Sequence, residues 1–171
     1  MANFKEAPVS GTYATMKSVF TALRNDDTLQ RYLYYPSVNM DDDPTDEKKP
    51  PVPEEAIDEL FRPTINVDDL EGSNKDKRGR ITFGLGATFK SYQNHKATKP
   101  FVHIYIWIPR YGFQDVDFRL EAILDRVQEI VSDKRFTGSF GRLTTDGGNP
   151  YDAPKGYLGY VIRYGFSDTD F

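Results

Sequence analysis

The sequence predicts an α+β domain, with a mainly antiparallel sheet of about four strands and helices packed on one face. The first observation is a strongly apolar stretch at 101–109, in which residues alternate with a period of two, as in a buried strand. The second is the amphipathic helical pattern at 116–131. The third is the order of the elements, which is helices, two strands, a helix and two more strands. Because the 171 residues contain no visible repeat or linker, we expect a single domain spanning 1–171.

The other elements are expected to pack on the central strand and the helix that follows it. Both faces of the strand are apolar or aromatic, and Pro109 ends it because proline cannot donate to a ladder. After a short loop, Asp115 is expected to cap the helix. The pattern places Arg119 on the polar outer face. The predicted inward face carries Val116, Leu120, Ile123, Leu124, Val127, Ile130 and Val131.

Two helical patterns precede this core. Ser10 is expected to cap a helix from about residue 11 to 24. Asp27 with Gln30 three residues later is a capping-box variant, which predicts a second helix over 27–35.

The next stretch, 36–53, is rich in proline and acidic residues and is predicted to form a long surface loop. A loop of this length in a compact domain is usually functional or disordered. A short helix is expected over 54–61, because Pro53 suits its start and acidic residues suit its first turn. A short strand is expected over 64–67.

Three further strands are predicted, over 80–90, 136–145 and 157–166. In the first of them apolar residues fill one face. Thr82 and two glycines occupy the other face, which is expected to meet solvent or a closely approaching neighbour. The remaining long loops are expected at 68–80 and 146–156, with a short C-terminal tail after the last strand.

The composition narrows the classes of function. The chain has no cysteine, which excludes disulfides, thiolate metal sites and cysteine nucleophiles. No apolar run approaches the roughly 20 residues of a membrane span, and the first residues lack a signal-peptide core, so we expect cytoplasmic synthesis and no membrane partner. The net charge is −4, and 41–59 contains nine acids against two lysines, so the remainder carries about +3. These counts do not support general affinity for nucleic acid.

Signatures of catalysis are weak. Of the two histidines, His103 falls within the central strand and is expected to be packed, and His95 falls in a polar loop. The Gly84–Gly86 stretch lacks the third glycine and the following helix of a dinucleotide fingerprint. The acidic triplet at 41–43 lacks the alternating ligands and the glycine of a calcium loop. We therefore expect no enzyme activity, no metal and no cofactor.

Two other classes of function stay open. A small hydrolase would need a pair of carboxylates in a cleft, one of them with a raised pKa. A nucleic-acid-binding module could stack bases on sheet aromatics, although only Arg110 and Arg163 interleave with them. The aromatic residues of such a platform would be Tyr105, Trp107, Tyr160 and Tyr164.

The features that remain are surfaces. Long loops, aromatic strands and glycine-marked strands fit a domain that contacts other protein copies. The basic cluster at 75–80 could bind phosphate, although such clusters are more often solvated or lie at protein interfaces. The candidate contact residues are Asp41, Asp42, Asp43, Lys75, Lys77, Arg78, Arg80, Tyr151, Arg163 and Phe171.

This arrangement resembles the tail terminators of tailed bacteriophages, which are also called tail-completion or head–tail joining proteins. The resemblance lies in the layout of most of the chain and not in a catalytic motif. Its parts are the opening helix with LQRYLYYPS and the acidic MDDDP, the strand VHIYIWIP, the helix RLEAILDRVQEIVSDK, and the glycine-marked GSFGRL and KGYLGYVIRYGFSD.

The resemblance implies a virion protein made in the host bacterial cytoplasm. It implies a homo-oligomeric ring, commonly a hexamer, that caps the head-proximal end of the tail, ends growth of the tube and joins it to the neck. The expected partners are then the tail tube protein and a neck or connector protein. DNA would pass through the lumen without specific binding. Another neck or baseplate structural protein is the alternative.

Overall fold

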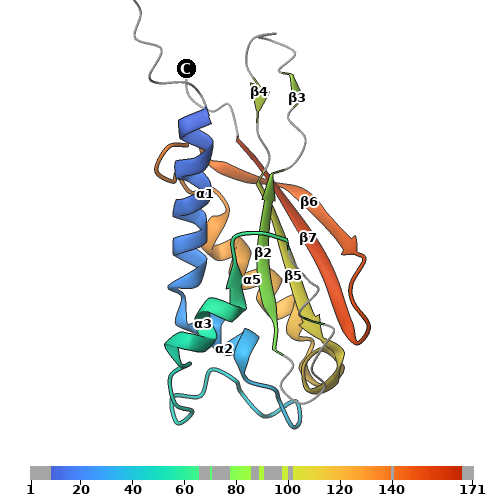
Figure 1. The fold of residues 1–171 in the computed structure, drawn as a ribbon. Helices are drawn as coiled ribbons and strands as arrows, with labels where there is room; N and C mark the ends of the chain where they lie inside the picture. The colour runs from blue at the N-terminus through green and yellow to red at the C-terminus, as the bar shows by residue number, and fades with distance from the viewer. Residues whose placement is uncertain are drawn as a thin grey trace, which may run out of the picture.

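The computed structural model describes residues 9–65, 70, 78–85, 89–90, 98–99, 102–139 and 141–166. These residues form a layer of helices packed against a five-stranded sheet with the strand order β1-β2-β5-β7-β6 (Figure 1). The sheet is antiparallel except where β1 pairs with β2. The predicted α+β class and mainly antiparallel sheet are therefore confirmed.

The sheet is centred on β5 (Val102–Pro109), which pairs with β2 (Arg80–Leu85) on one side and β7 (Tyr157–Phe166) on the other. Every residue of β5 except His103 is buried, as expected for a strand with two apolar faces. The prediction of a central strand ending at Pro109 is confirmed.

The fifth strand was not expected at its position. β1 (Phe61–Arg62) pairs in parallel with Ile81 and Thr82, directly after the helix α3 (Glu54–Leu60). The strand predicted over 64–67 is wrong at Thr64 and Ile65, which lie outside any strand, and its last two residues fall outside the described part. The predicted strand 80–90 is two pieces, since Phe89–Lys90 (β3) pairs with Thr98–Lys99 (β4) in a separate small sheet.

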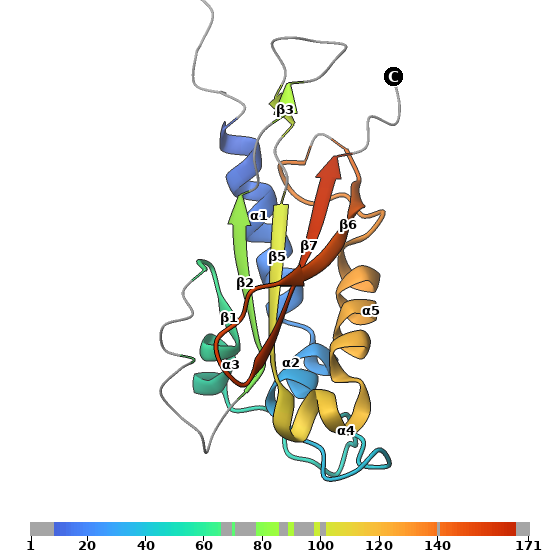
Figure 2. The ribbon, with the colours of Figure 1, turned by 90° about the vertical axis from the view of Figure 1, so that its right-hand side faces the viewer.

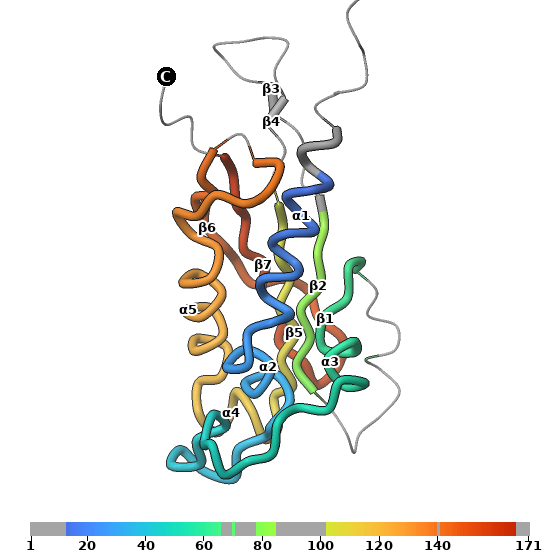
Figure 3. The backbone as a smooth tube through the Cα atoms, turned by 90° about the vertical axis from the view of Figure 1, so that its left-hand side faces the viewer, coloured from blue at the N-terminus to red at the C-terminus, as the bar shows by residue number. Residues whose placement is uncertain are grey.

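Three helices cover one face of the sheet, namely α1 (Val9–Arg24), α2 (Asp27–Tyr34) and α5 (Arg119–Val131) (Figure 3). Their buried side chains meet those of the sheet in one continuous core. Within the described residues, no helix combines the length and the apolar character needed to cross a membrane. The contributors from these helices and from α3 are Val19, Leu23, Leu29, Leu33, Ile57, Leu60, Ile123, Val127, Ile130 and Val131.

The predicted helix caps need correction. Ser10 lies inside α1, which begins at Val9. Asp26, and not Asp27, is the N-cap of α2, because its Oδ1 accepts the amide of Leu29 at 2.8 Å. Asp26 also pairs with Arg126 of α5 at 2.5 Å, so one carboxylate caps α2 and ties it to α5.

The helix predicted after the central strand is interrupted near its start. The turn Arg110–Gln114 leads into α4 (Asp115–Asp117), and Phe118 then adopts a left-handed conformation with φ 52°. α5 begins after this break, so Asp115 does not cap it. Its first turn is closed instead by Gln114, whose Oε1 accepts the amide of Leu120 at 2.7 Å.

The other face of the sheet is covered by the β6–β7 hairpin. β6 (Leu143–Tyr151) pairs with β7, and its distal half crosses in front of β5 (Figure 2). The Tyr151 ring lies 4.9 Å from that of Tyr105 and 5.7 Å from that of Trp107, centre to centre. Thr82 is fully buried here and accepts the indole N–H of Trp107 at 3.0 Å, so of the two expectations for this face, solvent or a closely approaching neighbour, the second is the one observed at Thr82.

The predicted strand 136–145 and loop 146–156 are displaced along the chain. β6 starts only at Leu143 and continues through the glycines to Tyr151, with a β-bulge between Thr145 and Gly148. The glycine and proline turn signals thus mark a bulge within a strand. Leu143 is also bridged to Lys134 on the outer side of β6.

Gly159 lets the hairpin close over the sheet. A Cβ at this position would lie 2.6 Å from the Tyr151 carbonyl oxygen and 3.1 Å from the Trp107 ring. We expect Gly159→Ala to lower the free energy of unfolding by about 1–3 kcal/mol, because neither the backbone nor the packed indole can yield easily. Urea denaturation followed by Trp107 fluorescence measures this change, and an unchanged midpoint would contradict it.

Candidate interaction surface

One end of the molecule is organised by a buried arginine. Arg119, at the start of α5, is 1% exposed. Its guanidinium donates to the carbonyl oxygens of Tyr32 at 2.6 Å and Tyr35 at 2.7 Å, and to Ser37 Oγ at 2.6 Å. Its charge is paired with Asp117, whose Oδ2 lies 2.5 Å from Nη2. Arg119 therefore joins the end of α2 and the start of the 36–53 loop to the α4–α5 junction.

A second arginine holds the far part of the same loop. Arg31 of α2 is 9% exposed and pairs with Asp27 at 2.7 Å. Its Nη1 donates to the carbonyl oxygens of Asp46 at 3.2 Å and Lys49 at 3.3 Å. The loop at 36–53 contains no helix or strand, as predicted, but it is fixed to the body from both sides.

Within the loop, two aspartates are bonded locally. Asp42 pairs with Lys49 at 2.6 Å and accepts the Val38 amide at 3.0 Å. Asp43 accepts the amide and the hydroxyl of Thr45, both at 2.7 Å. The Lys49 contact lowers the pKa of Asp42, and the Thr45 hydrogen bonds lower the pKa of Asp43, below the ordinary 3.8.

These contacts predict an acid-sensitive loop. A carboxylate whose pKa is depressed in the folded state stabilises that state above 3.8, and this contribution is lost as the pH falls through the lower, folded-state pKa. We expect the amide NMR signal of Val38 to shift in that range, while buried amides of β5 stay fixed. Asp42→Asn should show the shifted position already at neutral pH. If the Val38 signal stays as unchanged as the signals of β5 at every pH, the prediction is contradicted.

Exposed apolar side chains occur on both segments where the loop meets the α4 region. Val38 is 87% exposed, Met40 69%, Tyr111 79% and Phe118 62%. The two segments are bonded to each other beside these residues, because the Ser37 amide donates to the Gly112 carbonyl at 2.8 Å, and Ser37 Oγ to Asp117 Oδ2 at 2.7 Å. We call Val38, Met40, Tyr111 and Phe118 the apolar end.

The apolar end has the character of a contact surface. Exposed single apolar residues are ordinary, but several on one rigid support with a polar rim mark sites of protein association. Asp41 and Asp43 are exposed on the same loop and supply such a rim. In the sequence, two features indicated a contact role for this part of the chain, namely the acidic triplet at 41–43 and the length of the 36–53 loop.

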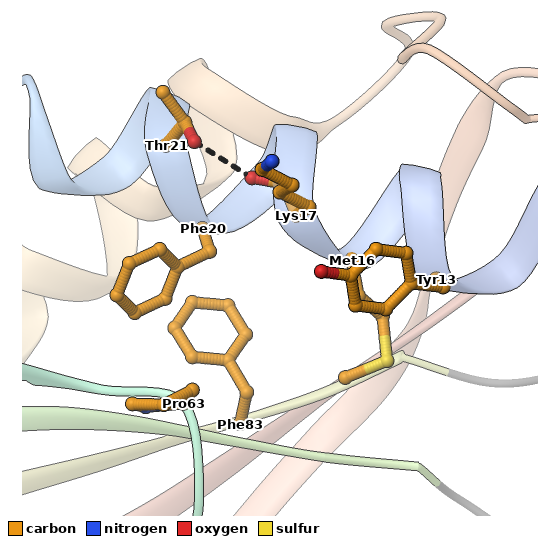
Figure 4. Close-up of a pocket in the computed structure, with 7 residues that line it drawn as sticks. All are labelled: Tyr13, Met16, Lys17, Phe20, Thr21, Pro63 and Phe83. Atoms are coloured by element: carbon orange, nitrogen blue, oxygen red, sulfur yellow. Dashed lines mark hydrogen bonds between the residues drawn. The ribbon is translucent and has the colours of Figure 1, made fainter.

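A second feature is a groove between α1 and the edge of the sheet (Figure 4). Its volume is about 440 Å³. Phe20 and Phe83 meet edge to face across its floor, with ring centres 5.3 Å apart. Lys17 provides a cation at the rim. The full lining is Tyr13, Met16, Lys17, Phe20, Thr21, Pro63 and Phe83.

The predicted contact residues do not form one surface. Asp41, Asp42 and Asp43 lie in the loop beside the apolar end. Tyr151 is 43% exposed and packs on the β5 aromatics, on another part of the molecule. Arg163 is exposed on β7 and donates to Asn149 Oδ1.

The two described basic residues of the 75–80 cluster make contacts within the fold. Arg80 is only 8% exposed and donates to the Glu59 carbonyl at 3.0 Å, so it is not available as a contact residue. The Arg78 guanidinium lies over the Tyr34 ring, 4.7 Å from its centre. Lys75, Lys77 and Phe171 lie outside the described residues.

The proposed base-stacking platform is not present as a surface. Tyr105, Trp107 and Tyr164 are at most 8% exposed, and Tyr160 is half-buried. His103 is half-buried with Nδ1 3.3 Å from the Tyr105 hydroxyl, and its pKa is lowered by burial and by Arg163. Among the residues described, no cluster of three or more His, Cys, Asp or Glu is arranged to hold a metal ion.

Comparisons with known proteins give one family. The model of the YomW family matches residues 26–166. No curated protein matches. The chain is also similar, with a TM-score of 0.46 and 15% sequence identity, to a chain in a solved structure described as "Virion of native gene transfer agent (GTA) particle", over 92% of this chain and 97% of that one. Since the family match covers most of the sequence, the chain belongs to the YomW family.

Proposed function

We propose that this chain is a structural subunit of a phage virion that acts through contacts between protein copies. It forms a ring, commonly of six subunits, at the head-proximal end of the tail, where it ends the tail tube and joins it to the neck. The sequence layout described above motivates this placement. The proposed role requires no reaction and no cofactor.

The observation that carries the proposal is the apolar end. Four large apolar side chains protrude from a loop and a turn that Arg119 and Arg31 hold in place. Because the segments are already ordered in the single subunit, binding of a partner there costs little additional conformational entropy. The apolar end is therefore suited to a permanent contact with a neighbouring subunit or with the tail tube.

The charge of the chain agrees with a position around DNA. A channel must let a polyanion pass without holding it, and a basic lining would bind the phosphates. The chain has a net charge of −4, and Lys49 neutralises only part of the acidic loop. Both features disfavour binding to the phosphates. In this proposal the sheet approaches the lumen and the helices lie outside.

The two other classes of function find less support. The groove between α1 and the sheet is lined by apolar residues with one lysine, and it does not bring two carboxylates together as a hydrolase needs. The aromatic rings of the sheet are packed against each other and are not open for stacking with bases.

The test is the molar mass of the purified protein across a concentration range, with electron micrographs of the same fractions. The proposal expects particles of about six copies with a central hole, in the protein alone or after addition of tail tubes. A protein that stays monomeric at high concentration and also fails to bind tail tubes would refute it.

A further inference from the structure

The groove beside α1 lies at an interrupted edge of the sheet. β1 pairs only with Ile81 and Thr82, so among the described residues the ladder stops before Phe83. The Phe83 side chain, on the helix side, forms part of the groove floor together with Phe20 (Figure 4). Tyr13, at one end of the groove, is 71% exposed. The groove is therefore an open apolar slot beside a strand edge.

The lining specifies the chemistry of what would fill the slot. Its volume of about 440 Å³ suits an aromatic side chain with a few neighbouring residues and is small for a folded element. The floor offers aromatic edges and Met16, which favour an aromatic guest. Lys17, the charged residue of the lining, favours acidic groups next to that guest.

One segment of the chain combines these properties. Residues 167–171, which follow β7, read SDTDF and place two aspartates just before a phenylalanine. We propose that this segment of one copy binds the groove of a second copy, with Phe171 between Tyr13 and Phe83 and the acidic residues facing Lys17. The inference rests on the assembly proposed above and names a contact within it.

The register of the sheet favours binding between copies. Phe83 lies level with Ile162 of β7, two strands away and four residues before Phe166. Phe166 is therefore about 13 Å further along the sheet and about 10 Å across it, a separation of about 16 Å. Five fully extended residues reach at most about 18 Å, so a contact within one chain would need the whole segment to be almost fully extended. The direct path also crosses the layer that α1 fills, where Val19 is packed, so Phe171 cannot easily enter the groove of its own chain (Figure 3).

The absence of cysteine allows a direct test by cross-linking. Thr21→Cys places a thiol in the groove wall without removing Lys17 or the aromatic floor. Thr169→Cys places the other thiol two residues before Phe171 and keeps both aspartates. The two single variants are mixed and treated with a short bifunctional maleimide. The matched control replaces Thr21→Cys by Asp125→Cys, an exposed position on α5.

We expect a covalent dimer in the Thr21→Cys and Thr169→Cys mixture at several times the yield of the control. Adding Phe171→Ala to the second variant should reduce that yield about tenfold, because the aromatic anchor is lost. The inference is overturned by equal yields in mixture and control. It is also overturned if the two thiols react only when both are placed in one chain, which would show binding in cis.

Electron micrographs of the same samples separate this inference from the proposed function. Rings without the specific cross-link leave the proposed function standing and overturn the groove contact. A specific cross-link in dimers or filaments without rings supports the contact and speaks against the ring.

Discussion

Replacing Arg119 by methionine is expected to lower the free energy of unfolding by about 3–5 kcal/mol, although its charge alone would suggest an exposed side chain. Asp117 would keep a nearly buried negative charge without its partner. The carbonyl oxygens of Tyr32 and Tyr35 would each lose a donor in a place where water has little access. For a chain of this size the melting temperature should fall by about 10 °C.

The matched control is Arg135→Met, because Arg135 is exposed beyond the end of α5. Its stability should stay within about 0.5 kcal/mol of the wild-type value. Arg119→Lys separates charge from geometry, since an ammonium cannot reach four acceptors in the plane of a guanidinium. If Arg119→Lys has the same melting temperature as the wild type, the network matters only through its charge. Our account of how Arg119 holds the 36–53 loop would then be wrong.

Phe118→Asn combined with Met40→Asp is expected to raise the protein concentration needed for half-maximal assembly more than a hundredfold. Each change removes a large exposed apolar group from the apolar end, and central contacts of this kind contribute about 2 kcal/mol or more each. The fold should tolerate both changes, because Met40 is a solvent-exposed loop residue and Asn accepts the left-handed conformation of Phe118 better than Phe does. Sedimentation velocity measures the loss of assembly, and thermal melting checks the fold.

The control for the pair is Ile65→Asp. Ile65 is 43% exposed and lies near Gly84, on a different part of the surface. If this change weakens assembly as strongly as the pair does, the effect comes from general hydrophobicity and not from the apolar end. If the pair melts normally and still assembles as the wild type does, the apolar end is not the contact.

The sequence was most informative where one physical signal dominated. β5 could be predicted because both of its faces are apolar over eight residues, a pattern that few other structures produce. The last strand, β7, alternates clearly and was predicted with its observed bounds. β6 was misplaced because its glycines and proline are ordinary turn residues, and a bulge uses them without ending the strand.

The anchor of the candidate surface was missed for a different reason. Arg119 lies four residues before Ile123 and eight before Val127, so its spacing places it on the buried stripe of α5. Because the side chain is charged, it was assigned instead to the exposed face of the helix. Burial is possible because Arg119 donates to two backbone carbonyls and to Ser37, which lie more than eighty residues earlier in the chain. No local sequence pattern predicts such contacts. Likewise, the burial of Thr82 depends on a hairpin that folds over it from the other end of the chain.

The bulge in β6 has a consequence for how copies of this chain can meet. A regular outer strand is a template on which another chain can extend the sheet without limit. Here the outer side of Leu143 is already bridged by Lys134, the ladder skips residues after Thr145, and Pro150 lacks the amide that a further strand would need. Extension of the sheet by another chain is thereby discouraged at this border, so contacts between copies that involve it would have to be made by side chains.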